Sequence, residues 1–446
     1  MTTEITFTSP AVDAGFLQDI LNRALKAGAS DAHIESSAAR SRRVELRDGA
    51  PQCLEHSETA NIRLTTYIGK RRATLGTNKF DGATVRDFIE RVMGMTRLAI
   101  EDPYCGLPPR ETVIEPGDDR HLDLCDPMEP SVTTLTSMAE QVELAARSVP
   151  GVCATQAATA VWRRREARVL NSGGLDRTSE GSSFAVGVSV VAGAGEEREV
   201  GAAGRMSCWG SDLPPLASIG TEAGEEAAAR IGGRKVPSGV APVIFDRRIA
   251  MSFLEPFLGA VAGESIARRS SFLLDELGKQ VFPKGFRLIE DPSLIRGLAS
   301  RACDAEGVVT TTRALVDDGV LTTWLLNCAV GRELGIASTG HAGGPTNLTV
   351  APGDRTQQQL MTEAGEGLLV TGLMGTSLNP HTGDWSVGVS GHWFHHGEIV
   401  HAVSEVTIAG ALPELYQELI WGSDLEMRDA ANAPSLLVPR MNVGGK

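Results

Sequence analysis

Long apolar runs, aromatic residues and a secretory leader are what this sequence most plainly lacks. Aromatic residues make up 5% of the 446 residues. The apolar stretches 251–262 and 368–374 are short or interrupted by Glu255, whereas a membrane-spanning helix needs about 20 apolar residues. Residues 1–10 contain an acid and no basic region ahead of an apolar run, which argues against a secretory signal. We therefore expect a soluble, cytoplasmic protein with no membrane partner.

Basic charge is also in deficit. The chain has 42 Lys and Arg against 56 Asp and Glu, for a formal net charge of −14. An acidic surface repels phosphate backbones and anionic headgroups, so direct binding of nucleic acid is not expected. The seven cysteines are odd in number, scattered and never spaced Cys-x-x-Cys. This usage favours buried, reduced thiols over disulfides or a zinc knuckle.

The length predicts two domains, because single cores stop growing near about 250–300 residues. The 49 glycines are numerous and indicate many turns. A Gly- and Pro-rich stretch at 232–239 has the composition of a linker, so we place the boundary there. The predicted fold is α+β: an N-terminal domain, 1–235 (sub-segments 1–128 and 129–235), with a sheet and covering helices, and a C-terminal domain, 236–446, dominated by a large antiparallel sheet.

Hydrophobic periodicity places the elements of the first domain. Asp48-Gly49 reads as a hairpin turn and residues 171–174 as another turn. Residues 192–203 are small and polar. Helices are expected at 11–27, 85–93, 131–148 and 220–231, and strands at 32–35, 44–47, 52–56, 62–68, 73–76, near 161, at 168–170 and at 184–191.

In the second domain, a strand at 241–245 precedes an apolar helical stripe at 250–261. Strand patterns dominate from there on. The expected strands are 308–312, 320–326, 367–373, 385–394 and 398–408.

Common catalytic motifs are absent. No Gly-x-Gly-x-x-Gly follows a strand, and the sequence around 232–235 lacks the spacing of a phosphate-binding loop. The stretch 388–391 only approaches the Gly-x-Ser-x-Gly nucleophile motif, in a strand-to-strand context. His never precedes Glu, so the paired zinc ligand and general base of helical metallopeptidases are missing.

Five of the nine histidines lie within 21 residues: His381, His392, His395, His396 and His401. If His396 and Gly397 form a two-residue hairpin loop, His395 pairs with Glu398 and His392 lies opposite His401. That pair could share a metal, with Asp384 or Glu405 as a third ligand. The alternative is a polar hairpin surface, because His395 points to the other face and a closed site needs three or four ligands.

Several ordered blocks of the sequence form one recognisable pattern: 241–245, 271–275 with 277–280, 338–344, 367–375, 382–393 with 397–399, and 403–410. In this order they resemble the TldD/PmbA family, and within it the PmbA (TldE) branch. The resemblance extends over essentially the whole chain and is less specific in the first half, where 28–31 is similar.

The resemblance implies one subunit of a cytoplasmic two-subunit zinc metalloprotease that cuts unfolded peptides. The TldD-like paralogous partner carries a His-Glu-x-x-x-His zinc motif. At the matching positions this chain has Glu255, Pro256 and Ala260. Pro and Ala supply neither ligand nor base, so we expect no catalytic residue and no cofactor in this chain, zinc in the partner, and a heterodimer. A homodimer is the alternative for the isolated chain.

The Gly-rich loop at 341–347 is the candidate peptide contact, through His341, Gly343, Gly344 and Asn347. Glycine lets backbone approach a substrate strand, although a tight turn between two strands explains the loop equally well. Two other functions stay open: an autonomous metal-dependent hydrolase that uses His392 and His401, and a non-catalytic homodimeric peptide-binding protein. Family members are also called modulators of DNA gyrase, but the acidic charge gives no reason for direct DNA contact.

Overall fold

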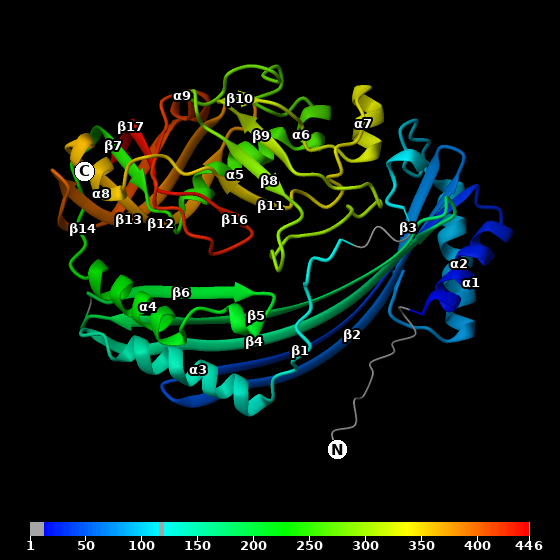
Figure 1. Ribbon diagram of the computed structural model, residues 1–446, viewed down its shortest axis with the longest axis horizontal. Helices are drawn as coiled ribbons and strands as arrows, with labels where there is room; N and C mark the ends of the chain where they lie inside the picture. Colours follow the sequence, from blue (N-terminus) through cyan, green and yellow to red (C-terminus); the bar gives the residue numbers. More distant parts are fainter. Residues whose placement is uncertain (1–12, 116–119, 196, 446) are drawn as a thin grey trace.

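The computed structural model describes residues 13–115, 120–195 and 197–445, and its fold is α+β, as predicted (Figure 1). Residues 1–10, considered for a leader, and the first two residues of the helix predicted from 11 lie outside the described residues. No helix in the described part of the chain is long and apolar enough to cross a membrane. The division of the chain near residue 235 stays a prediction.

The first part is one antiparallel sheet in the order β3-β2-β1-β4-β5-β6. Long strands from β1 to β5 curve together along the lower edge of the molecule in Figure 1. The strands are β1 (Asp31–Arg47), β2 (Ala50–Ile68), β3 (Arg71–Thr77), β4 (Val152–Asn171), β5 (Asp176–Ala192) and β6 (Glu199–Ser207).

The prediction of four short strands between 32 and 68 is wrong, because β1 and β2 each run unbroken. The Asp48-Gly49 turn between them is confirmed, with φ of 50° and 76°. Polar residues in the middle of β1 do not interrupt it, since their side chains have partners. Arg40 pairs with Glu129 at 3.3 Å, and Arg42 donates to the carbonyl of Pro130 at 2.7 Å.

Helices cover this sheet at both ends. Helices α1 (Ala14–Lys26) and α2 (Gly82–Leu98) enclose one apolar cluster, and α3 (Val132–Arg147) and α4 (Leu216–Arg230) enclose another. The segment 192–203 was predicted only as small and polar, yet β6 occupies much of it. Gly201 explains the small residues, because a Cβ there would lie 2.3 Å from the carbonyl oxygen of Ala223 in α4.

The second part contains a closed barrel. Its sheet has the order β14-β13-β12-β7-β17-β15, and a further pairing of β14 with β17 closes the strands from β14 to β17 into a barrel. The sheet is not wholly antiparallel, since β7 and β12 run parallel. Its strands are β7 (Gly239–Phe245), β12 (Glu366–Leu378), β13 (Asp384–His395), β14 (Glu398–Ala411), β15 (Ile420–Trp421) and β17 (Leu436–Gly444).

A second sheet, in the order β10-β9-β8-β11-β16, lies in the same part of the chain. The strand predicted at 308–312 is wrong, because the strand begins at Arg313. The sheet comprises β8 (Leu288–Asp291), β9 (Arg313–Asp317), β10 (Val320–Leu321), β11 (Asn347–Val350) and β16 (Ala431–Asn432). The helices of this part are α5 (Ala250–Val261), α6 (Gly263–Ala267), α7 (Cys328–Leu334), α8 (Gln357–Ala364) and α9 (Leu412–Gln417).

All seven cysteines are free thiols, but fewer are buried than predicted. Cys105, Cys208 and Cys328 are buried, whereas Cys153 is exposed. Burial raises the pKa of the Cys328 thiol to about 12, so it stays protonated at neutral pH.

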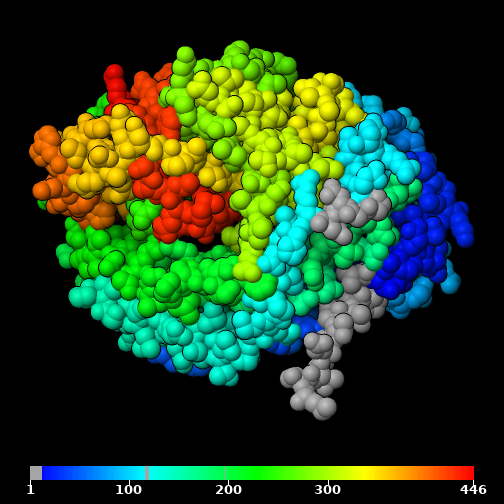
Figure 2. All heavy atoms as spheres, in the orientation of Figure 1, coloured from blue at the N-terminus to red at the C-terminus, as the bar shows by residue number. Residues whose placement is uncertain are grey.

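Ion pairs join the two parts where β6 and α4 meet the residues after β7. In α4, Glu222 lies within reach of three arginines: Arg205 of β6 at 2.7 Å, Arg248 at 3.9 Å and Arg428. Glu426 pairs with Arg247 and Arg428, each at 3.1 Å. These side chains line a cavity of about 420 Å³, and Figure 2 shows a hollow between the green and red residues of this region.

We expect Glu222→Gln to lower the free energy of unfolding by about 1–3 kcal/mol, because three partly buried guanidinium groups lose their shared carboxylate. Urea titration at low and high salt measures the change. Glu225→Gln is the matched control, since Glu225 lies exposed on the same helix. An equal effect of both substitutions would show that the network does not hold the two parts together.

Candidate functional site

Helix α5 holds Glu255, Pro256 and Ala260, where the resemblance placed the zinc motif, and is mainly a packing element. Phe253 stacks on Phe245 of β7 with ring centroids 4.3 Å apart, and Phe257 contacts Phe282 at 5.2 Å. The hydroxyl of Tyr416 donates to the carbonyl of Phe253 at 3.0 Å. One apolar face of the helix is therefore committed to the core shared by the barrel and the second sheet.

The opposite side of α5 faces outward. Glu255 and Gly259 are exposed, and Pro256 is half-buried. No hydrogen bond or ion pair joins the carboxylate of Glu255 to any other described residue. Ala260 is buried, and its carbonyl accepts a hydrogen bond from Ser271 Oγ at 2.7 Å. Of the three motif positions, only Glu255 offers a side-chain donor atom to a metal.

Zinc in a hydrolase needs three protein ligands and an open position for water. Within residues 13–115, 120–195 and 197–445, no group of three or more His, Cys, Asp or Glu side chains is arranged to hold a metal ion. The donor set around α5 does not fit a zinc centre, so no chemical step through a metal follows for the described residues.

The histidine hairpin forms as predicted at its tip but not along its strands. His396 and Gly397 have φ of 47° and 87°, and His395 pairs with Glu398. The prediction that His392 faces His401 is wrong. An irregularity beside Phe394 shifts the register, so that His401 lies opposite Trp393 and His392 lies opposite Ala402.

The two histidines therefore have separate surroundings. Burial, together with the nearby charges of Arg248 and Arg230, lowers the pKa of His392. His401 instead lines a pocket together with Trp393 and Glu366, and its Nδ1 lies 2.9 Å from the carbonyl oxygen of Ala402. Neither Asp384 nor Glu405 joins them in a common group within the described residues.

The loop at 341–347 belongs to a buried hydrogen-bond network, and part of its backbone is exposed. His341 Nε2 lies 2.9 Å from Glu290 Oε2, and the backbone N–H and hydroxyl of Thr346 donate to Glu290 Oε1 at 2.7 and 2.9 Å. His341 and Asn347 are buried, whereas Gly343 is exposed. Peptide contact at this loop stays a prediction, and the accessible part of it is the backbone at Gly343 and Gly344.

Gly343 and Gly344 need the left-handed backbone, with φ of 102° and 88°, which other residues rarely adopt. The sequence suggested contact residues here but not Glu290, which lies 51 residues before His341. Burial alone would raise the pKa of Glu290, but hydrogen bonds from His341 and Thr346 hold it below its ordinary value of 4.5.

We expect the pair Glu290–His341 to make the free energy of unfolding depend on pH in the acid range. Because the folded-state pKa of Glu290 is lowered, its contribution is present above about pH 4.5 and is lost as the pH falls through the lowered value. Glu290→Gln should flatten the decline of unfolding free energy between neutral and acid pH, measured by urea titration. Glu333→Gln, at an exposed carboxylate, should leave the slope unchanged; the same slope in wild type and Glu290→Gln would contradict the assignment.

We also expect Pro256→Ala to stabilise the protein by about 1–3 kcal/mol, because proline inside a helix leaves the carbonyl four residues earlier without its donor. That carbonyl belongs to Ser252. Thermal and urea unfolding measure the change.

Gly259→Ala is the comparison for this substitution, since a Cβ there meets no atom within 4 Å and should add about 0.5–1 kcal/mol. Destabilisation by Pro256→Ala, with Gly259→Ala stabilising, would mean that the fold needs the bend.

Two segments of the chain match family models. Residues 125–231 match the PmbA/TldA metallopeptidase central domain, and residues 238–445 match the PmbA/TldA metallopeptidase C-terminal domain. The chain is 32% identical over 435 residues to the metalloprotease PmbA of Escherichia coli O157:H7, covering 96% of both chains.

Solved structures have the same architecture. One from Bacteroides thetaiotaomicron, described as a candidate modulator of DNA gyrase, aligns with a TM-score of 0.91 at 25% identity, covering 97% of this chain and 98% of that one. TldE from Thermococcus kodakarensis aligns with a TM-score of 0.83 at 20% identity, covering 96% and 100%. The second likeness shows the fold alone.

Proposed function

Because the chain belongs to the PmbA/TldD metallopeptidase family, we propose that it is the PmbA/TldE-like, non-catalytic subunit of a cytoplasmic two-subunit zinc metalloprotease. A TldD-like paralogue supplies the zinc ligands and the general base. The two subunits form a heterodimer that cuts unfolded peptides. The isolated chain is inactive and is either monomeric or a homodimer.

The residues at the matched motif positions on α5 are the observation that supports a non-catalytic role for this chain. In this chain the motif positions are an unpaired carboxylate, a proline and a buried alanine, Glu255, Pro256 and Ala260. A hydrolytic zinc site needs imidazole or similar donors on one face and a base beside the bound water. A helix with these residues can present a surface to a partner, but it cannot assemble that site by itself.

The autonomous hydrolase is less well supported. It needs His392 and His401 on one metal, and the register of β13 and β14 places them opposite different residues. The second alternative is a homodimeric peptide-binding protein without catalysis. The experiment below distinguishes it from the proposal.

The substrate in this proposal is a peptide and not nucleic acid. One structural relative is described as a candidate modulator of DNA gyrase. In this proposal, any effect of this chain on gyrase is indirect and runs through proteolysis of a peptide or protein. The net charge of −14 opposes contact with a phosphate backbone.

The decisive experiment mixes this chain with a TldD-like paralogue that carries the intact motif. We expect the chain alone to bind no stoichiometric zinc by elemental analysis and to leave a fluorogenic unfolded peptide uncut. The mixture should cut the peptide in a chelator-sensitive reaction and elute as a heterodimer in size-exclusion chromatography.

Two controls sharpen this test. Glu255→Gln in this chain should leave cleavage by the pair unchanged, because Glu255 is neither ligand nor base in the proposal. Replacing the motif glutamate of the partner should abolish cleavage. Tight zinc binding with chelator-sensitive cleavage by this chain alone would overturn the proposal, and so would a mixture that neither associates nor cuts.

A further inference from the structure

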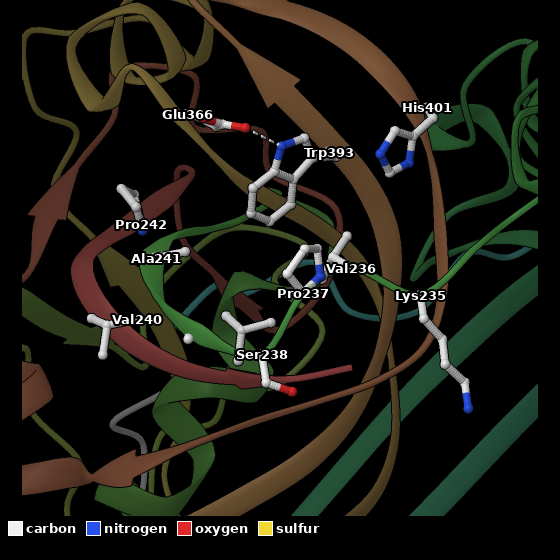
Figure 3. Close-up of a pocket in the computed structure, with 12 residues that line it drawn as sticks. Lys235, Val236, Pro237, Ser238, Val240, Ala241, Pro242, Glu366, Trp393 and His401 are labelled. Atoms are coloured by element: carbon white, nitrogen blue, oxygen red, sulfur yellow. Dashed lines mark hydrogen bonds between the residues drawn. The ribbon is translucent and has the colours of Figure 1, made fainter. Parts of the chain in front are cut away.

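The mouth of the barrel holds a pocket of about 370 Å³ that the proposed function does not use. It lies where β7 and β12 begin, where β13 and β17 end, and beside the linker that enters β7. Val240, Pro237 and Pro242 supply apolar walls, and Trp393, Glu366 and His401 supply an aromatic ring and polar groups. Figure 3 shows Trp393 between Glu366 and His401, with Pro237 below it.

A hydrogen bond from the indole to a carboxylate orients this aromatic wall. Trp393 Nε1 donates to Glu366 Oε1 at 2.8 Å. Glu366 is exposed, and no other hydrogen bond or ion pair joins its side chain to a described residue. Its second carboxylate oxygen is therefore free to accept a hydrogen bond at the rim of the pocket.

His401 adds a second acceptor. Its Nδ1 lies 2.9 Å from the carbonyl oxygen of Ala402, and since a carbonyl only accepts, Nδ1 carries the proton. In the neutral ring Nε2 is then an acceptor. The pocket thus combines an indole face with two acceptors, which suits a ligand group that has several N–H donors and a positive charge.

The charge of the pocket favours the same ligand. Lys235 is the basic residue of the lining, but its ammonium pairs with Glu405 at 3.2 Å, and in Figure 3 its side chain is directed away from Trp393. The charge beside the indole is therefore the carboxylate of Glu366. Attraction between a cation and an indole face adds to this pairing.

A strand edge beside the pocket can hold a peptide backbone. Residues 239–241 of β7 pair with β17, but β12 joins β7 only from Val243 onward. On that side, 239–241 has no strand partner within the described residues. Such an edge can hydrogen-bond to an added extended segment.

We propose that the barrel mouth binds the basic side chain of an extended peptide, with its ammonium or guanidinium group on the face of Trp393 and beside the carboxylate of Glu366. The choice of a peptide rests on the proposed function, whereas recognition of the cation rests on the pocket alone. The site would select substrates by a basic residue, and it lies apart from α5.

Calorimetry with this chain alone tests the proposal, using the peptides acetyl-Ala-Lys-Ala-amide and acetyl-Ala-norleucine-Ala-amide. Norleucine keeps the apolar stem of lysine and lacks its charge. We expect the lysine peptide to bind roughly tenfold more tightly or better. Equal binding of the two peptides, or no binding of either, would overturn the proposal.

Variants locate the binding. Glu366→Gln and Trp393→Ala should each weaken binding of the lysine peptide by about tenfold. Circular dichroism checks that each variant is folded. Trp393→Phe keeps an aromatic face and covers the case in which Trp393→Ala misfolds; it should weaken binding less than Glu366→Gln. The matched control is Glu398→Gln, which removes the same charge from an exposed position on the hairpin and should change nothing. Loss of binding in Glu398→Gln equal to that in Glu366→Gln would mean non-specific charge attraction and would overturn the site.

This assay separates the two proposals. Lysine-peptide binding by a chain that never supports proteolysis would leave the pocket standing and remove the proposed function. Cleavage by the pair, with no binding of the lysine peptide to this chain, would do the reverse.

Discussion

Burial of α5 is the constraint on which the C-terminal half depends. The helix packs against β7 through stacked Phe253 and Phe245 and is held at its far side by Tyr416. Both the barrel and the second sheet contribute to the apolar cluster around it. Because so much of the helix is committed to packing, only one narrow strip of it faces outward. In this chain that strip carries Glu255, Pro256 and Gly259.

The closed barrel and the curved N-terminal sheet differ in how their strand edges and faces are covered. Closure of β14 on β17 covers most strand edges of the C-terminal sheet, but at the mouth β7 starts before its neighbour β12 and leaves part of its edge open. The N-terminal sheet stays open and depends on helices at its ends. Between them, Glu222 and Glu426 gather arginines from both parts of the chain. The two parts are thus joined by charge pairing in addition to apolar contact.

Local patterns predicted the elements well, and long-range contacts decided the rest. The turns at Asp48-Gly49 and His396-Gly397 follow from short-range backbone preferences. The register shift beside Phe394 does not, because it depends on how β13 and β14 fit the barrel. The same limit applies to β1, whose arginines needed Glu129, and to His341, whose partner Glu290 is distant in sequence. Local patterns gave no role for the residues on α5; the resemblance suggested one, which stays a prediction.

The order of strands in the barrel has a consequence for biosynthesis. Gly239 at the start of β7 pairs with Val443 of β17, and β17 also closes the seam with β14. At typical translation rates the intervening segment takes roughly 10 to 40 s to emerge from the ribosome. During that interval β7 and the apolar face of α5 are without their final neighbours. The nascent chain therefore exposes the apolar face of α5 until the last strand of the barrel has been made, and in this interval that face is available to a holdase chaperone.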